Sequence, residues 1–276
     1  MGLADLRGYS VPFSPRGTAQ IVGGIPWNFG VDILAIQYRT DPAEIAKLLP
    51  EPLEPSQEEP DVAYVWFGDW QGLWAGHDDM LAVNPERCQY TECLIGVRCS
   101  YNGVEGQRVV YIWVDKDFSL TRGWFMGFPK KFGTVHMGQR NRHLHALNPA
   151  TQACGPGSAY GAICESHGER LVTAKIAVRE QIVPARLPKP FGTDLFHTLH
   201  FPSADVNGHE KPLLHQLVQT VSSNVKFGEL WSGAGELTYH ESLFEEHTAI
   251  APHEILGAYI IPVGFRIEGT KLIHTY

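Results

Sequence analysis

Two adjacent lysines, Lys130 and Lys131, lie in one of the most apolar and aromatic stretches of the 276-residue chain, residues 124–133. Lysine is seldom buried, because an unpaired ammonium group is costly to remove from water. Pro129 is excluded from a helix interior, so we expect the lysines to begin a strand, where consecutive side chains point to opposite faces. The two ammonium groups should therefore have different roles.

A lysine in such surroundings can act as a nucleophile. With an ordinary pKa of about 10.4 it is almost fully protonated at pH 7, but desolvation and a nearby positive charge both lower the pKa. The free amine of Lys130 would then attack a ketone and form a Schiff base. We expect Phe128, Trp124 and Phe132 to desolvate it and line a substrate pocket, and Lys131 to lower its pKa or position its strand. The alternative is a solvated lysine pair whose stems cover apolar surface.

The segment Phe128-Pro129-Lys130-Lys131-Phe132-Gly133 resembles the aromatic-Pro-Lys-Lys-apolar-Gly signature of the acetoacetate decarboxylase family. Other segments resemble the same family in the same order, and the combination is specific although no single piece is. These segments are Tyr38-Arg39-Thr40-Asp41, Leu49-Pro50-Glu51-Pro52-Leu53, Tyr90-Thr91-Glu92, Tyr101-Asn102-Gly103-Val104, Trp231-Ser232-Gly233 and Ile260-Ile261-Pro262. Acetoacetate decarboxylase is itself the standard example of lysine activation, so the mechanism is implied by the resemblance.

The resemblance also assigns roles to acidic and basic residues. Glu92 matches the family's active-site glutamate, which implies acid–base or positioning work beside the Schiff base. The family's active-site arginine lies seven residues before the position of Tyr38, and this chain has Val31 there. Since that arginine is thought to handle the substrate carboxylate, decarboxylation of acetoacetate itself is left open. Arg122 or Arg98 is a candidate replacement, although an arginine near a pocket is more often a structural ion-pair partner.

Three functions follow as hypotheses. The first is decarboxylation of a β-keto acid, acetoacetate-like or bulkier, through a Schiff base on Lys130 and without a cofactor. The second keeps the Schiff base but performs aldol or dehydration chemistry on 2-oxo acids and aldehydes, as family relatives resembling aldolase-dehydratases do. The third is a non-catalytic barrel that binds a small ketone or lipid. Trp66, Trp70, Trp74 and Trp113 hint at a larger or aromatic ketone, although core packing explains any one of them as well.

The composition limits which classes of binding partner and which cellular compartment we expect for this protein. The net charge of −8 and the lack of a basic cluster argue against nucleic acid, and no segment reads as a membrane span or signal peptide. Five cysteines without a Cys-x-x-Cys pair favour a reduced, cytoplasmic setting. His143 and His145 alternate as metal ligands sometimes do, but no third ligand is evident, so we expect no metal. A homo-oligomer is implied by resemblance alone.

The pattern of elements predicts a mainly β (α+β) fold. Short strands with frequent turn signals favour a closed or nearly closed sheet, and the resemblance implies a β-barrel or cone with a few short helices and an internal pocket. We expect one domain over residues 1–276, with an irregular arm at residues 1–30. Predicted details include a strand at 32–40, a helix capped by Asp41, a strand at 62–67 and a long loop at 69–86. We also predict a hairpin around Asn102-Gly103 and a helix at 118–126.

Overall fold

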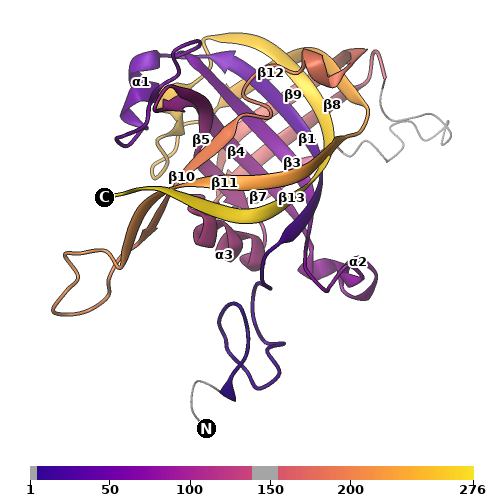
Figure 1. Cartoon of the computed structure of the whole chain (residues 1–276). Helices are drawn as coiled ribbons and strands as arrows, with labels where there is room; N and C mark the ends of the chain where they lie inside the picture. Colours follow the sequence, from indigo (N-terminus) through magenta and orange to yellow (C-terminus); the bar gives the residue numbers. More distant parts are fainter. Residues whose placement is uncertain (1–4, 139–154) are drawn as a thin grey trace.

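The computed structural model describes residues 5–138 and 155–276, and these form one mixed sheet with short helices around it (Figure 1). The prediction of a mainly β fold is confirmed. The strands are β1 Trp27–Arg39, β2 Glu54–Pro55, β3 Val62–Trp74, β4 Gln89–Tyr101, β5 Val104–Val114, β6 Lys130–Phe132, β7 Thr134–Met137, β8 Ala159–Ser166, β9 Glu169–Ile182, β10 Asp194–Phe201, β11 Leu214–Phe227, β12 Leu230–Tyr239 and β13 Glu254–Thr275. The helices are α1 Pro42–Lys47, α2 Met80–Val83 and α3 Asp117–Met126, with single 3-10 turns at Pro85–Arg87, Pro184–Arg186 and His247–Ile250.

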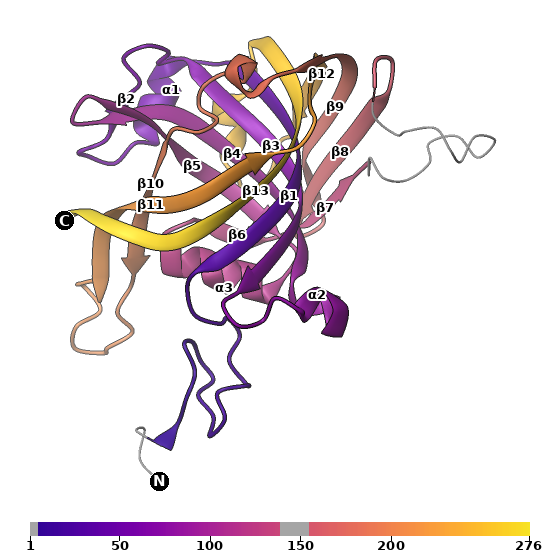
Figure 2. The same cartoon turned by 45° about the vertical axis from the view of Figure 1, so that its right-hand side comes forward.

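Seven strands of this sheet close into a ring. The order β1-β3-β4-β5-β10-β11-β13 returns to β1, because β13 also pairs with β1 along the whole length of β1. Strands β12, β9, β8 and β7 leave the ring as a second layer, visible beside it in Figures 1 and 2. The expected barrel or cone is therefore refined: part of the sheet closes into a ring, but the whole sheet is not a true barrel. The reason is the length of β13, whose free edge pairs with β12 near residue 259 and with β11 from residue 263 onward.

Strand β1 is buried on both faces, and this creates two hydrophobic cores. Trp27, Phe29 and Ile33 belong to a core inside the ring, whereas Leu34 and Ile36 pack with residues of the second layer. Because alternate side chains point to opposite faces, a strand between two layers reads as a nearly continuous apolar run. The interior of the ring thus has its own set of side chains, separate from the packing between layers.

Several local predictions are confirmed. Asp41 caps α1 by accepting a hydrogen bond from the Ala43 amide at 2.8 Å. Asn102 and Gly103 both have positive φ between β4 and β5, as a two-residue hairpin turn requires. Helix α3 covers the predicted residues and ends at Gly127, whose φ of 83° is the left-handed conformation that glycine adopts most easily.

The predicted loop at residues 69–86 is wrong in two places, because β3 continues to Trp74 and α2 spans Met80–Val83. In the second half of β3, the inward positions alternate between tryptophan and glycine. Because glycine has a low strand propensity, this half was predicted as a loop. The glycines leave room for neighbouring side chains: a Cβ at Gly68 would overlap the indole of Trp70, and one at Gly72 would lie 2.9 Å from Arg122 Nη1. Strand β1 also begins at Trp27, earlier than predicted.

Helix α3 lies at the end of the ring from which the N-terminal segment extends (Figures 1 and 2). Its buried face carries Ser119, Arg122, Gly123 and Met126, a spacing that places these residues on one side of a helix. None of the helices in residues 5–138 and 155–276 is long and apolar enough to cross a membrane.

Candidate active site

Lys130 is buried inside the ring. Strand β6 runs parallel to β5, with Lys130 opposite Ile112, and the lysine residue is only 7% exposed. Its Nζ donates hydrogen bonds to Glu92 Oε2 at 2.7 Å and to Ser119 Oγ at 3.0 Å. Gly123 of α3 makes room for the lysine stem, since a Cβ there would lie 2.7 Å from Lys130 Cγ. The sequence therefore places a single ammonium group against a buried carboxylate and a hydroxyl.

Burial lowers the pKa of Lys130 below its usual value. The negative charge of Glu92 and its hydrogen bond oppose this effect, and the positive charge of Arg122 adds to it. The net direction is downward, which raises the share of free amine at neutral pH. A lysine with these neighbours is suited to nucleophilic attack on a carbonyl.

Arg122 is a second buried cation, 3% exposed, and it lacks an anionic partner within the described residues. Its guanidinium lies 4.7 Å from the ring centroid of Phe29 and 5.3 Å from that of Tyr90. No atom of the described residues accepts a hydrogen bond from Nη2. A buried guanidinium at a cavity wall, held by aromatic rings and with Nη2 open to an acceptor, is suited to bind a carboxylate ligand.

A cavity of about 290 Å³ joins these groups. Lys130, Glu92, Arg122 and Phe128 all line it, so the structure brings together four of the residues selected from sequence. The remaining lining is mostly apolar or aromatic and includes Phe29, Ile33, Trp66, Trp70, Tyr90, Leu94, Met126, Phe191, Val263 and Phe265. A concave, mainly apolar site with a few convergent charges is typical of a small-molecule active site.

Sequence reasoning missed Ser119 and Tyr90 as site residues. Both carried a signal: Tyr90 precedes Glu92 by two residues on a strand, and Ser119 precedes Arg122 by three residues on a helix. These spacings place each pair on one face. Tyr90 stacks on Trp70 with ring centroids 5.7 Å apart, and burial raises the pKa of its hydroxyl.

Lys131 points away from the cavity, as expected for the next residue of a strand. It forms an ion pair with Glu245 and lies 5.5 Å from the ring centroid of Trp113. Burial and Arg122, rather than Lys131, lower the pKa of Lys130. The expected contribution of Lys131 to that pKa therefore has no support in the geometry.

Trp124 and Phe132 do not line the cavity and are 48% and 56% exposed. Both are too exposed to desolvate Lys130, and the rings nearest its ammonium group are those of Tyr90 and Phe128, with centroids 5.3 and 5.9 Å from Nζ. Trp124 has a structural contact with the site, because its indole Nε1 donates to the Lys130 carbonyl at 2.9 Å.

Arg98 is fully buried but pairs with Glu58, Glu59 and Glu105. These carboxylates account for its charge, so Arg98 is a structural ion-pair partner and Arg122 is the arginine of the cavity.

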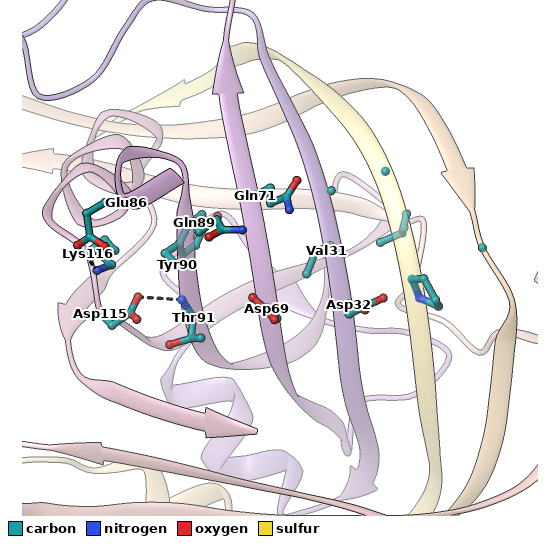
Figure 3. Close-up of a pocket in the computed structure, with 15 residues that line it drawn as sticks. Val31, Asp32, Asp69, Gln71, Glu86, Gln89, Tyr90, Thr91, Asp115 and Lys116 are labelled. Atoms are coloured by element: carbon teal, nitrogen blue, oxygen red, sulfur yellow. Dashed lines mark hydrogen bonds and ion pairs between the residues drawn. The ribbon is translucent and has the colours of Figure 1, made fainter. Parts of the chain in front are cut away.

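Val31 lines a different hollow, an open groove of about 720 Å³ on the sheet (Figure 3). The groove is larger than the cavity around Lys130, but its side chains are mainly carboxylates and amides on neighbouring strands, including Asp32, Asp69 and Gln71 (Figure 3). Lys116 in its wall is paired with Glu86. Because none of these groups resembles the buried lysine–carboxylate pair, we take the smaller cavity as the candidate active site.

Within the described residues, no cluster of three or more His, Cys, Asp or Glu side chains is arranged to hold a metal. His143 and His145, considered as ligands from sequence, lie outside the described residues.

Comparison with known proteins agrees with this geometry. The family model for acetoacetate decarboxylase (ADC) matches residues 9–276. The chain is 24% identical to an acetoacetate decarboxylase of Clostridium beijerinckii over 273 residues, which are 97% of this chain and 93% of that protein.

Among solved structures, the chain is similar to the enduracididine biosynthesis enzyme MppR, in a complex with the condensation product of pyruvate and imidazole 4-carboxaldehyde. The identity is 31%, the TM-score is 0.87, and all of each chain is covered. It is also similar to an acetoacetate decarboxylase-like enzyme from Sphingomonas wittichii RW1, at 26% identity and a TM-score of 0.87, covering 98% of this chain and 100% of that one.

Proposed function

Because the chain belongs to the acetoacetate decarboxylase family, we propose that Lys130 forms a Schiff base with the carbonyl carbon of a short oxo acid. The observation that carries this proposal is the burial of Lys130 Nζ beside Glu92, at 2.7 Å, with its pKa lowered. The iminium formed on Lys130 serves as the electron sink, so this chemistry needs no organic cofactor.

The first steps follow from the hydrogen bonds of Lys130. Its free amine adds to the carbonyl and gives a carbinolamine, which loses water to become the iminium. Glu92, already bonded to Nζ, takes one proton from the Lys130 ammonium group before the attack and later returns it to the departing hydroxyl, while a second proton passes from nitrogen to the carbonyl oxygen as the carbinolamine forms. Ser119 holds Nζ from the side of α3. For condensation, Glu92, a carboxylate again, then takes a proton from the carbon next to the iminium, which gives an enamine.

Arg122 decides which reaction we place first. An arginine that holds the substrate carboxylate helps to bind the substrate of either reaction, but in a decarboxylation it loses that partner as carbon dioxide leaves. In an aldol condensation the carboxylate is retained throughout, and the same contact is useful at every step. We therefore place condensation of a 2-oxo acid with an aldehyde first: the enamine carbon attacks the aldehyde, water is eliminated, and hydrolysis frees Lys130. The similarity to MppR supports this order.

Decarboxylation of a β-keto acid is the second candidate, and the curated relative from Clostridium beijerinckii favours it. The iminium would lose carbon dioxide, Glu92 would pass a proton from solvent to the enamine carbon, and water would release the ketone. Both candidates share the Lys130 adduct. A non-catalytic ketone-binding protein, by contrast, would bind its ligand without it.

Borohydride trapping tests the proposal. The protein is incubated with pyruvate or acetoacetate, reduced, and mapped by peptide mass, with Lys130→Ala as the matched variant. A reduced adduct on Lys130 supports the Schiff base, and parallel assays of carbon dioxide release and of pyruvate–aldehyde condensation separate the two reactions. Absence of any adduct with every oxo acid would reject the proposal.

A further inference from the structure

The residues that line the cavity can be placed along its length by their positions next to strand β3. Its inward positions recur every second residue, at about 3.3 Å per residue. Gly72 lies against Arg122, and Gly68 pairs with Glu92, the partner of Lys130. Trp66 is the next inward position and lines the cavity beyond Glu92. Arg122 and Trp66 therefore lie on opposite sides of the Lys130–Glu92 pair.

The side beyond Trp66 is closed by Phe191, from the segment between β9 and β10. Its ring is nearly parallel to that of Trp66, at 25° and 6.2 Å between centroids, and it contacts Tyr64 and Tyr259 at the same centroid distance. Phe191 also lines the cavity. Gly192 and Thr193 of the same connecting segment also line the cavity, but Phe191 is the one large side chain among these three residues.

Buried hydrogen bonds hold this segment on the ring. Gln37 Nε2 donates to the carbonyl of Lys189 at 2.6 Å, and Gln107 Nε2 donates to that of Pro190 at 3.1 Å. Both glutamines are buried. Phe191 is thus positioned by residues of β1 and β5 rather than by its own loop alone.

We infer that Phe191 is a specificity-determining residue that limits the length of the aldehyde substituent. This inference rests on the proposed function. With the carboxylate at Arg122 and the carbonyl carbon at Lys130, the aldehyde must approach from the side of Trp66, and its substituent points toward Phe191. The cavity of about 290 Å³ is roughly twice the ~150 Å³ that accommodates benzene, so it has room for a short oxo acid and one ring. The substrate class is therefore a small aryl or alkyl aldehyde without a second ring.

The test measures kcat/KM for condensation of pyruvate with acetaldehyde, benzaldehyde and biphenyl-4-carboxaldehyde. In Phe191→Ala, the ratio of the biphenyl to the benzaldehyde value should rise about tenfold or more, because space is added next to the substituent. In Phe191→Trp, the ratio of benzaldehyde to acetaldehyde should fall by a similar factor. Phe244→Ala is the matched control, since Phe244 is 84% exposed, and it should leave both ratios unchanged.

Unchanged ratios in both Phe191 variants would overturn the inference. If Phe191→Ala does not fold, Phe191→Leu and Phe191→Trp still test the same ratios. A wild-type protein that traps pyruvate on Lys130 and condenses it with none of the aldehydes would also overturn the inference while leaving the Schiff base intact. A wild-type protein that traps no oxo acid would reject the proposed function, and the inference with it.

Discussion

Replacing Arg122 by methionine should separate recognition of the carboxylate from formation of the Schiff base. A hydrogen bond to a charged group contributes about 1.5–3 kcal/mol, and 1.4 kcal/mol corresponds to a factor of ten. Adduct formation with pyruvate should therefore become roughly 10- to 150-fold less efficient at low substrate concentration. Acetone, which has no carboxylate, should not show this loss.

The same substitution should also change the protonation of Lys130. The guanidinium carbon of Arg122 and the ammonium nitrogen of Lys130 each lie 5.3 Å from the centroid of Tyr90, so the two charges are at most 10.6 Å apart. At an effective dielectric constant of about 20, this greatest separation corresponds to a repulsion of about 1.6 kcal/mol, so the actual repulsion is at least that large. Removing the guanidinium should raise the pKa of Lys130, and trapping of acetone should then require a higher pH. Lys131→Met should have a smaller effect, because Lys131 is paired with Glu245 on the other face.

The assay is the initial rate of borohydride-trapped adduct, by intact mass, for pyruvate and acetone between pH 6 and pH 10. Three proteins are compared: wild type, Arg122→Met and Lys131→Met. An equal loss for pyruvate and acetone at the optimal pH of each protein would refute the carboxylate contact. A pH profile shifted more by Lys131→Met than by Arg122→Met would refute the assignment of the neighbouring charge.

Three further predictions concern the same site. Lys130→Ala should abolish the trapped adduct while keeping a cooperative thermal transition; an adduct elsewhere by peptide mapping would contradict this. Gly123→Ala should keep a cooperative thermal transition, because the helix propensity of alanine partly offsets the overpacking, yet lower adduct formation at least about tenfold, because its Cβ displaces the stem of Lys130. His197→Phe should stabilise the fold by about 1–3 kcal/mol, because both ring nitrogens of this buried histidine lack partners within the described residues. Burial holds the pKa of His197 well below 6.5, so the stability of the wild type falls as the pH drops below about 6.5 toward that value. Urea unfolding at pH 5 and pH 7.5 should show a larger gain at pH 5, and an equal gain would refute this reasoning.

The sequence allowed prediction of the elements whose signals are local. Asp41 and Pro42 marked a helix start, Asn102-Gly103 marked a hairpin, and Pro129 marked the boundary before Lys130. Each of these depends on backbone preferences of one or two residues, which act regardless of distant contacts.

The second half of β3 could not be predicted in the same way. Gly68 and Gly72 read as loop residues because glycine has a low strand propensity, but in the fold they make room for Trp70 and Arg122. These glycines can be explained only from the closed ring, because the need for space comes from side chains packed inside it.

The site was predictable in part. Lys130 and Glu92 followed from a motif, and Arg122 was one of two arginines that the sequence did not separate. The distinction came from tertiary contacts, since Arg98 has three carboxylate neighbours and Arg122 lies among aromatic rings. Phe191 carried no signal, because its role depends on where a connecting segment crosses the ring.

The ring has one weak seam. Strands β1 and β13 pair along all of β1, whereas β5 and β10 share two residue pairs, Asp194 with Gly106 and Leu195 with Gln107. Local opening is easiest where the fewest backbone hydrogen bonds must break, so fluctuations of the wall should concentrate at this seam. Because Gln107, Asp194 and Leu195 also line the cavity, such fluctuations would expose the interior to solvent without disturbing the strands that hold Glu92 and Lys130. Opening of this kind would widen access to the cavity that holds Lys130, and among the strands of the ring we expect amide exchange to be fastest at these paired residues of β5 and β10.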